Sequence, residues 1–132
     1  MNNNITLSIC IATLNRASFI GETLESIISQ ATAEVEIVIV DGASTDNTEE
    51  VIRGYQHKFP FIRYVRLSIK GGVDQDYCRA VELAEGKYCW LFTDDDVLKP
   101  GAIKTVLDEL QHDYGLIILN SEVRDKDLSK VL

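Results

Sequence analysis

The apolar positions of this chain follow two periodicities that alternate along its length. Runs that are continuously apolar or alternate with period two are typical of strands, whereas apolar residues three and four apart are typical of helices. Four helical runs are separated by strand-like runs, and the first of them places Ile20, Leu24 and Ile27 on one stripe. The five strand-like runs lie at residues 5–12, 34–40, 61–67, 88–93 and 116–119.

Turn and capping residues mark the ends of the predicted helices. Ser44 and Asp46 carry oxygen atoms that can cap a second helix, which we expect to stop near Gly54. In the third helix we expect Val81 to face the core, together with Tyr77 and Leu83. Gly86 lies where a left-handed residue commonly ends such a helix.

Strands that alternate with helices through short connections predict an α/β fold. We expect a mostly parallel sheet with right-handed crossovers and helices on both faces, about five strands alternating with four helices. A chain of 132 residues has room for one core, so residues 1–132 are expected to form a single domain. In such sheets ligands bind at the carboxyl ends of the strands, and the unusual polar residues of this sequence lie there.

Composition excludes several classes of function. Thirteen Lys and Arg stand against 21 Asp and Glu, a formal charge of −8, which disfavours nucleic acid as a partner because such binding depends on positive side chains. No apolar run approaches the about 20 residues of a transmembrane segment, and no secretory signal pattern is present, so we expect a cytoplasmic protein. The three cysteines form no CxxC pair, and we expect reduced, mostly buried thiols.

Three consecutive carboxylates, Asp94, Asp95 and Asp96, directly follow the fourth predicted strand. Like charges so close raise one another's pKa unless a cation relieves them. Mg²⁺ or Mn²⁺ would do so, because these ions prefer oxygen ligands and often combine one or two protein carboxylates with substrate phosphates and water. The alternative is a solvated turn whose aspartates cap the next helix, and the position after a buried strand favours the metal.

Polar residues after the first two strands extend the candidate site. Asp41 follows the second strand and can accept hydrogen bonds, as the acid at the equivalent strand end of dinucleotide-binding folds does from ribose. Arg16 lies near a helix start and can attract an anion, although a surface salt bridge is the competing interpretation. Neither GxGxxG nor GxxxxGK[ST] occurs, so the sequence does not support a dinucleotide dehydrogenase or a P-loop nucleotidase.

Three segments together resemble the amino-terminal half of a family 2 glycosyltransferase with the GT-A fold. They are SICIATLNR at 8–16, EIVIVDGASTDNT at 36–48 and GKYCWLFTDDDVL at 86–98, in the family's order over nearly the whole chain. Within the family the chain looks most like bacterial enzymes that build O-antigen or other surface polysaccharides. The resemblance implies a Rossmann-like half that binds a nucleotide-diphosphate sugar.

The resemblance also implies roles for residues after the first two strands. Thr13 and Asp41 match the family's positions that line the nucleotide base. Asn15 and Arg16 fall in the same matching segment, and we place them in the nucleotide-sugar site.

The aspartate motif of the family binds the ribose and, through a divalent metal, the diphosphate. Its common form is D-x-D-D, whose first Asp aligns with Thr93 here. In that register Asp95 is the main metal ligand, and we expect Asp95 and Asp96 to bind the metal and Asp94 and Asp95 to belong to the nucleotide-sugar site. A literal D-x-D reading instead favours Asp94 and Asp96 as the metal ligands.

The chain departs from the family's pattern in two respects. At 76–80 the family usually has an Arg-Asn-x-Gly-like sequence near the nucleotide, whereas this chain has Tyr77 for the Arg, Cys78 for the Asn and Ala80 for the Gly. The second is length, because the family's acceptor-binding half, with its acidic general base, follows the fifth strand. We therefore expect the catalytic base beyond Leu132, and any peripheral membrane association through that region.

The implied reaction is inverting transfer of a sugar from a nucleotide-diphosphate sugar to a glycan or lipid-linked acceptor, with this chain binding the donor but transferring nothing alone. The alternative is a non-catalytic nucleotide-sugar-binding or scaffold module. A phosphoreceiver signalling domain also has about five parallel strands and an acidic Mg²⁺ site. It needs acids after the first strand and a Lys after the fifth, where this chain has Asn15-Arg16 and Asn120-Ser121-Glu122.

Overall fold

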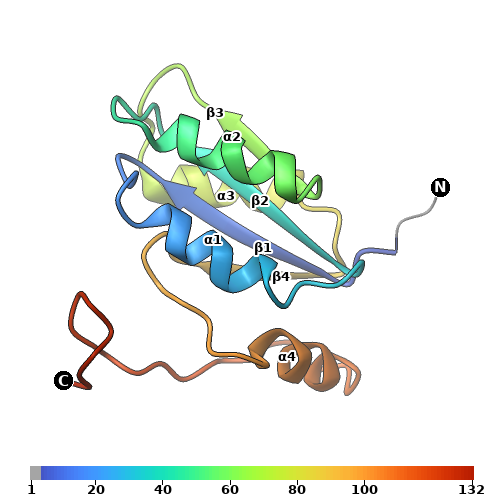
Figure 1. Ribbon diagram of the computed structural model, residues 1–132. Helices are drawn as coiled ribbons and strands as arrows, with labels where there is room; N and C mark the ends of the chain where they lie inside the picture. Colours follow the sequence, from blue (N-terminus) through green and yellow to red (C-terminus); the bar gives the residue numbers. More distant parts are fainter. Residues whose placement is uncertain (1–3) are drawn as a thin grey trace.

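The computed structural model describes residues 4–132 and shows a sheet with helices on both of its faces (Figure 1). Strands and helices alternate along the chain as far as the last helix. The strands are β1 (Leu7–Thr13), β2 (Val35–Asp41), β3 (Ile62–Arg66) and β4 (Tyr88–Phe92). The helices are α1 (Ile20–Ile28), α2 (Thr48–Lys58), α3 (Val73–Leu83) and α4 (Ala102–Leu110).

The four strands form one parallel sheet in the order β3-β2-β1-β4. Every residue of the two central strands, β1 and β2, is buried, which explains their continuously apolar sequences. Thr13 at the end of β1 pairs with Asp41 at the end of β2, and Asp41 pairs with Arg66 at the end of β3. The predicted α/β fold is confirmed, and the carboxyl ends of these strands lie level at one edge.

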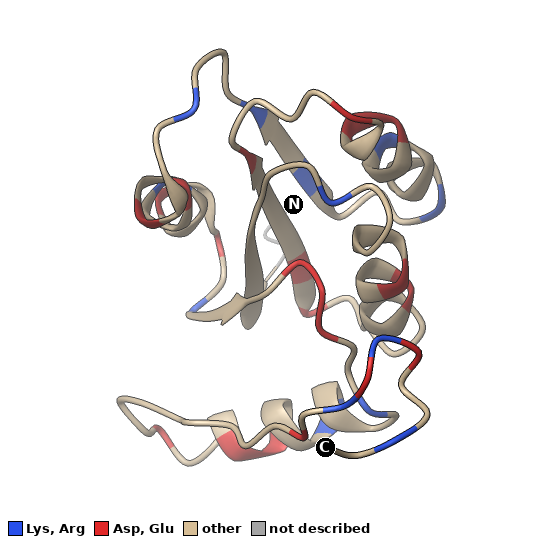
Figure 2. Cartoon of the chain, turned by 90° about the vertical axis from the view of Figure 1, so that its left-hand side faces the viewer, with Lys and Arg blue, Asp and Glu red and all other residues tan. Residues whose placement is uncertain are grey.

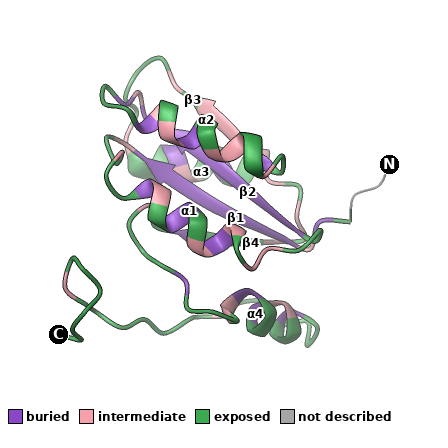
Figure 3. Cartoon of the chain, viewed as in Figure 1, coloured by how far each residue is buried: buried purple, intermediate pink, exposed green. Residues whose placement is uncertain are grey.

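The two faces of the sheet are covered differently. One face carries Ile9, Ile11, Ile37 and Ile39, which form the main core with apolar residues of α1, α2 and α4. The other face, with Cys10, Val38 and Val40 at its centre, packs against Ala80 of α3. Figure 3 shows β1 and β2 as the most continuously buried part of the molecule. The prediction of helices on both faces is therefore confirmed.

The prediction of a fifth strand at 116–119 is wrong. This segment pairs with no strand among residues 4–132, and Leu116 and Ile118 are 78% and 85% exposed. A strand forms only where a neighbour offers backbone donors and acceptors in register, so the apolar run could not make one by itself. The described chain has four strands alternating with four helices, and it continues as an irregular segment after α4 (Figure 1).

Gly86 does not end α3 in the left-handed conformation that we expected. The helix ends at Leu83. The next residue, Ala84, is extended, and Gly86 instead lies tightly against β1. A Cβ atom on Gly86 would lie 2.6 Å from Ser8 Oγ and 2.8 Å from Ser8 N. The backbone N–H of Gly86 donates to Ser8 Oγ at 2.8 Å, and that of Glu85 donates to Glu36 Oε1 at 2.6 Å. Glycine is needed at position 86 because β1 lies too close to its backbone to leave room for a side chain.

Two further helix expectations are corrected. The second helix continues beyond Gly54 to Lys58, because a glycine inside a helix weakens it without ending it. In α3, Val81 is 42% exposed, and the side that faces the sheet carries Asp76 and Ala80. Tyr77 and Leu83 are only half-buried.

The cysteines are free, as expected, but only Cys10 is buried. Burial, reinforced by the neighbouring Cys89, raises the pKa of Cys10 to about 12. Cys78 lies on the outer side of α3, and Cys89 lies on the edge strand β4, so both are exposed and the prediction of buried thiols is wrong for them. In the part of the chain that is described, no helix combines the length and apolar character of a membrane span.

Candidate functional site

The segments that follow β1, β2 and β4 meet the start of α3 at the carboxyl edge of the sheet. The backbone N–H of Gly42, just after β2, donates to the carbonyl oxygen of Thr13 at 2.9 Å. The hydroxyl of Tyr77 in α3 donates to the carbonyl oxygen of Phe92 at the end of β4, at 2.8 Å. Arg16 Nε lies 3.5 Å from Asp94 Oδ1, which connects the loops after β1 and β4.

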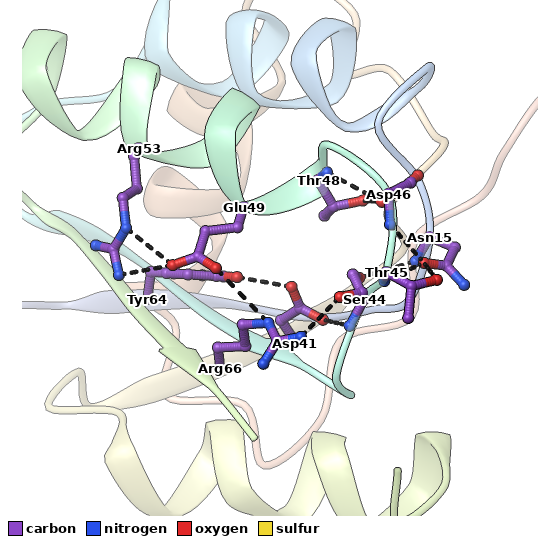
Figure 4. A network of polar contacts seen from close by, with 10 residues as sticks. All are labelled: Asn15, Asp41, Ser44, Thr45, Asp46, Thr48, Glu49, Arg53, Tyr64 and Arg66. Carbon is purple, nitrogen blue, oxygen red and sulfur yellow. Dashed lines mark hydrogen bonds and ion pairs between the residues drawn. The ribbon is translucent and has the colours of Figure 1, made fainter. Parts of the chain in front are cut away.

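The loops after β1 and β2 are locked together by hydrogen bonds (Figure 4). Asn15 Oδ1 accepts from the backbone N–H of Thr45 at 2.7 Å, and the backbone N–H of Asn15 donates to Ser44 Oγ at 2.9 Å. Asp46 lies just before the N-cap residue of α2, Asn47, and its Oδ1 accepts from the backbone N–H of Thr48, the first residue of the helix, at 3.0 Å. Asn15 thus holds the two loops in position with its carbonyl oxygen, in a left-handed conformation that asparagine tolerates.

Asp41 is the organising carboxylate of the loop after β2. It is fully buried, and its Oδ1 accepts from the backbone N–H of Ser44 at 2.7 Å while its Oδ2 accepts from the Tyr64 hydroxyl at 2.6 Å. Burial and then the hydrogen bond to Asp41 raise the pKa of Tyr64. Arg66 adds a bond from Nη2 to the carbonyl oxygen of Ser44 at 2.8 Å. Two residues of β3 therefore fix the loop from the side opposite to Asn15 (Figure 4).

The three aspartates after β4 differ in their surroundings. The Asp94 side chain is 15% exposed, and burial raises its pKa although the nearby Thr13 hydroxyl and Arg16 guanidinium oppose this. Burial and then the Asp94 charge raise the pKa of Tyr77. Asp95 and Asp96 are exposed, and neither forms an ion pair with any residue in the range 4–132.

The donor set after β4 suits a hard divalent ion that brings ligands of its own. Among residues 4–132 there is no group of three or more His, Cys, Asp or Glu side chains placed to hold a metal ion. A site enclosed by protein ligands is therefore not formed by the described chain. Asp95 and Asp96 are exposed, and such carboxylates can bind Mg²⁺ or Mn²⁺ when substrate phosphates and water complete the coordination.

Asp76 is a residue of this edge that the sequence did not single out. It lies in the first turn of α3, is 4% exposed and packs against Gly42, where a Cβ atom would lie 2.7 Å from Asp76 Oδ2. Burial and then the Asp41 charge raise the pKa of Asp76. The sequence held one signal for it: Asp76 is four residues before Ala80 and so shares the buried stripe of α3.

The structure therefore brings most of the predicted site residues to one edge of the sheet. Thr13 and Asp41 lie side by side, and Arg16 joins Asp94. Asn15 is close by, with its carbonyl oxygen engaged in the loop. Figure 2 shows acidic residues on the helices as well as beside the sheet, so the charge of −8 is spread over the molecule.

Comparison with known proteins gives a consistent result. The model of the family described as glycosyl transferase family 2 matches residues 8–130. Abequosyltransferase RfbV of Salmonella typhimurium is 34% identical over 128 residues, which are 95% of this chain and 38% of that protein. The crystal structure of S. aureus TarS 1–349 in complex with UDP-GlcNAc has a TM-score of 0.77 and 26% identity, covering 82% of this chain and 32% of that one.

A third similarity concerns the fold alone. The mannosyltransferase PcManGT from Pyrobaculum calidifontis, in complex with GDP-Man and Mn²⁺, has a TM-score of 0.74 at 23% identity and covers 83% of this chain and 33% of that one. This chain thus spans less than half the length of each of the three similar proteins. With its parallel sheet, its strand-end residues and the match over 8–130, the chain belongs to glycosyl transferase family 2.

Proposed function

We propose that this chain is the donor-binding half of a glycosyltransferase that transfers a sugar from a nucleotide-diphosphate sugar to a glycan or lipid-linked acceptor in bacterial polysaccharide synthesis. The observation that carries the proposal is the meeting of Thr13, Asp41 and Asp94 at one edge of a parallel sheet. Two similar proteins support it, since RfbV is named an abequosyltransferase and TarS was crystallised with UDP-GlcNAc.

The nucleoside part of the donor is assigned to the end of β1 and β2. Thr13 and Asp41 would line the base, and each oxygen of Asp41 keeps one lone pair beyond the single hydrogen bond that it accepts. Asn15 and Arg16 would frame this subsite, because their backbone N–H groups bind Ser44 and Thr48 and so fix the loop beside it.

The diphosphate is assigned to the segment after β4. Asp95 and Asp96 would hold Mg²⁺ or Mn²⁺, and Asp94, kept in place by Arg16, would face the ribose. A bound divalent ion supplies Lewis-acid stabilisation of the departing nucleoside diphosphate. The chain itself carries a net charge of −8, so its carboxylates alone would repel the diphosphate.

The transfer that we propose inverts the anomeric centre. An acidic base removes the proton of an acceptor hydroxyl, whose oxygen then attacks the anomeric carbon. We assign this base and the acceptor site to residues outside 1–132, because the chain spans 38% of the length of RfbV. Residues 1–132 then bind the donor and transfer nothing alone. A cytoplasmic location goes with this proposal, with attachment to the inner face of the membrane through residues outside this chain.

Calorimetric titration of the 132-residue chain with UDP, CDP and GDP tests the proposal. With Mn²⁺ present we expect one of the three to bind, and with a chelator we expect its affinity to fall by about tenfold or more, a loss of about 1.4 kcal/mol. Asp95→Ala and Asp96→Ala should cause a similar loss in the presence of Mn²⁺. Glu109→Ala, which removes an exposed carboxylate of α4, is the matched control and should change nothing.

Metal-independent binding that is indifferent to both aspartate substitutions would overturn the metal assignment. Sugar transfer by a longer protein that includes the region after Leu132 distinguishes the enzyme from a non-catalytic binding module. We expect transfer by the longer protein and none by residues 1–132.

A further inference from the structure

Asp76 carries a buried oxygen atom without a hydrogen-bond partner at the nucleoside end of the proposed site. The residue is 4% exposed, and its Oδ1 finds no donor anywhere in the described chain. The hydroxyl oxygen of Thr13 is also buried and lies near Asp94, but it forms no hydrogen bond of good geometry in that part of the chain. Gly42 lies between the two residues, donating to the Thr13 carbonyl and leaving room for the Asp76 carboxyl.

No cation of the described chain pairs with Asp76. Arg16 pairs with Asp94, and Arg66 binds Glu49 and the carbonyl oxygen of Ser44. The neighbouring charge is that of Asp41, which opposes ionisation of Asp76. A buried polar atom with no partner costs free energy, so Asp76 does not serve stability, and a group from outside the chain is its natural partner.

The position of Asp76 indicates which part of a nucleotide sugar that group belongs to. Two adjacent carboxyl groups, Asp41 and Asp76, disfavour a phosphate. A nucleobase is different, because its edge presents N–H donors beside carbonyl or ring-nitrogen acceptors. The free carboxyl oxygen of Asp76 can accept a hydrogen bond from an N–H group of such an edge.

We propose that Asp76 contacts the nucleobase of the donor and is a specificity-determining residue of this chain. The inference rests on the proposed function and adds a residue to it. Asp76 approaches the base from the first turn of α3, on the α3 side of Gly42, and hydrogen-bonds its polar edge. A site that hydrogen-bonds one base in this way rejects another whose donors and acceptors do not match, because buried polar groups are then left unpaired.

Calorimetry with base-containing and base-free ligands tests this inference. The ligands are UDP, CDP, GDP and inorganic pyrophosphate, each with Mn²⁺. Asp76→Ala should weaken the preferred nucleotide by about tenfold or more and leave pyrophosphate binding within about twofold. Asp76→Asn, which keeps the shape but changes the donors and acceptors, should change the ratio of affinities among the three nucleotides. Asp74→Ala, an exposed acid two residues away in the same helix, should alter none of them.

The outcomes separate this inference from the proposed function. If the wild-type chain binds none of the nucleotides, both are overturned. If it binds one but Asp76→Ala leaves all affinities unchanged, or weakens pyrophosphate equally, the base contact alone is overturned. Thermal unfolding of each variant establishes that it is folded, and Asp76→Asn serves if Asp76→Ala is not.

Discussion

At the scale of single residues, Gly86 shows how one position can join three strands. Its N–H donates to Ser8 in β1, and the adjacent Glu85 N–H donates to Glu36 in β2, just before the chain enters β4. Ser8 and Glu36 are both buried and hydrogen-bonded to each other, and the two N–H groups before β4 complete this buried network. Any side chain at Gly86 would separate these elements.

Gly86→Ala is therefore expected to destabilise the chain. The added Cβ would meet backbone atoms of β1 at 2.8 to 3.0 Å, and relieving that overlap should cost about 1–3 kcal/mol. Urea unfolding measures the loss as a lower midpoint. Gly54→Ala is the control, since nothing lies within 4 Å of the new atom in α2, and it should raise the free energy of unfolding by about 0.5–1 kcal/mol. Equal midpoints for Gly86→Ala and wild type would contradict the close approach.

Asp76 makes the stability of the chain depend on pH in a predictable direction. Burial and the Asp41 charge raise its pKa in the folded protein above the usual 3.8. As the pH rises from 3.8 through the folded pKa, the unfolded chain loses this proton first, so ionisation lowers the free energy of unfolding. Asp76→Asn should therefore unfold at a higher temperature than wild type near pH 7, with a difference that shrinks as the pH falls toward about 4. A difference that does not vary with pH would contradict this assignment.

At the scale of elements, α4 is attached to the core through one buried stripe. Ile103 is fully buried, and Val106 and Leu110 continue the stripe along the helix. Gly101, in the left-handed conformation, turns the chain into the helix, and the backbone N–H of Ile103 donates to Gln30 Oε1 at 3.0 Å. The docking of α4 thus depends on a few contacts.

Ile103→Ala is expected to cost about 2–4 kcal/mol, because it removes buried methylene groups and leaves a cavity. Val81→Ala is the comparison in α3, where helical periodicity predicted a core position but the side chain is 42% exposed. It should change the free energy of unfolding by about 0.5 kcal/mol or less. Chemical denaturation measures the free energy of unfolding of both variants. An equally large loss for Val81→Ala would contradict the exposed position of Val81.

At the scale of the whole molecule, stability is expected to decline from the centre of the sheet toward the end of the chain. The central strands are completely buried and hydrogen-bonded on both sides, whereas 116–123 has no regular structure and exposes most of its apolar side chains (Figure 3). Backbone amides that lack buried neighbours open most readily.

Hydrogen exchange measured by mass spectrometry on the whole chain should follow this gradient. We expect the slowest exchange in Leu7–Thr13 and Val35–Asp41 and the fastest in 116–123. Strong protection at 116–119 would contradict the structure and would support the fifth strand that the apolar pattern predicted. Addition of a nucleotide that binds with Mn²⁺ should slow exchange in the loops after β1 and β2.

Much of the fold follows from the sequence, because local periodicity reports which side of each element is buried. The strands β1 to β4 and the helix stripes of α1 and α4 are predicted in this way, with boundaries shifted by a few residues. The meeting of Thr13, Arg16, Asp41 and Asp94 also follows, since parallel strands joined by helical crossovers must place their carboxyl ends at one edge.

What only the tertiary structure decided concerns which segments become neighbours. The run at 116–119 is apolar enough for a strand but finds no strand to pair with in the described chain. Gly86 is required because β1 lies against it, and Asp76 is unpartnered because α3 places it beside Asp41 and Gly42. A sequence encodes the burial and conformation of each segment through its own residues, whereas steric room and hydrogen-bond partners belong to pairs of segments and exist only once the chain has folded.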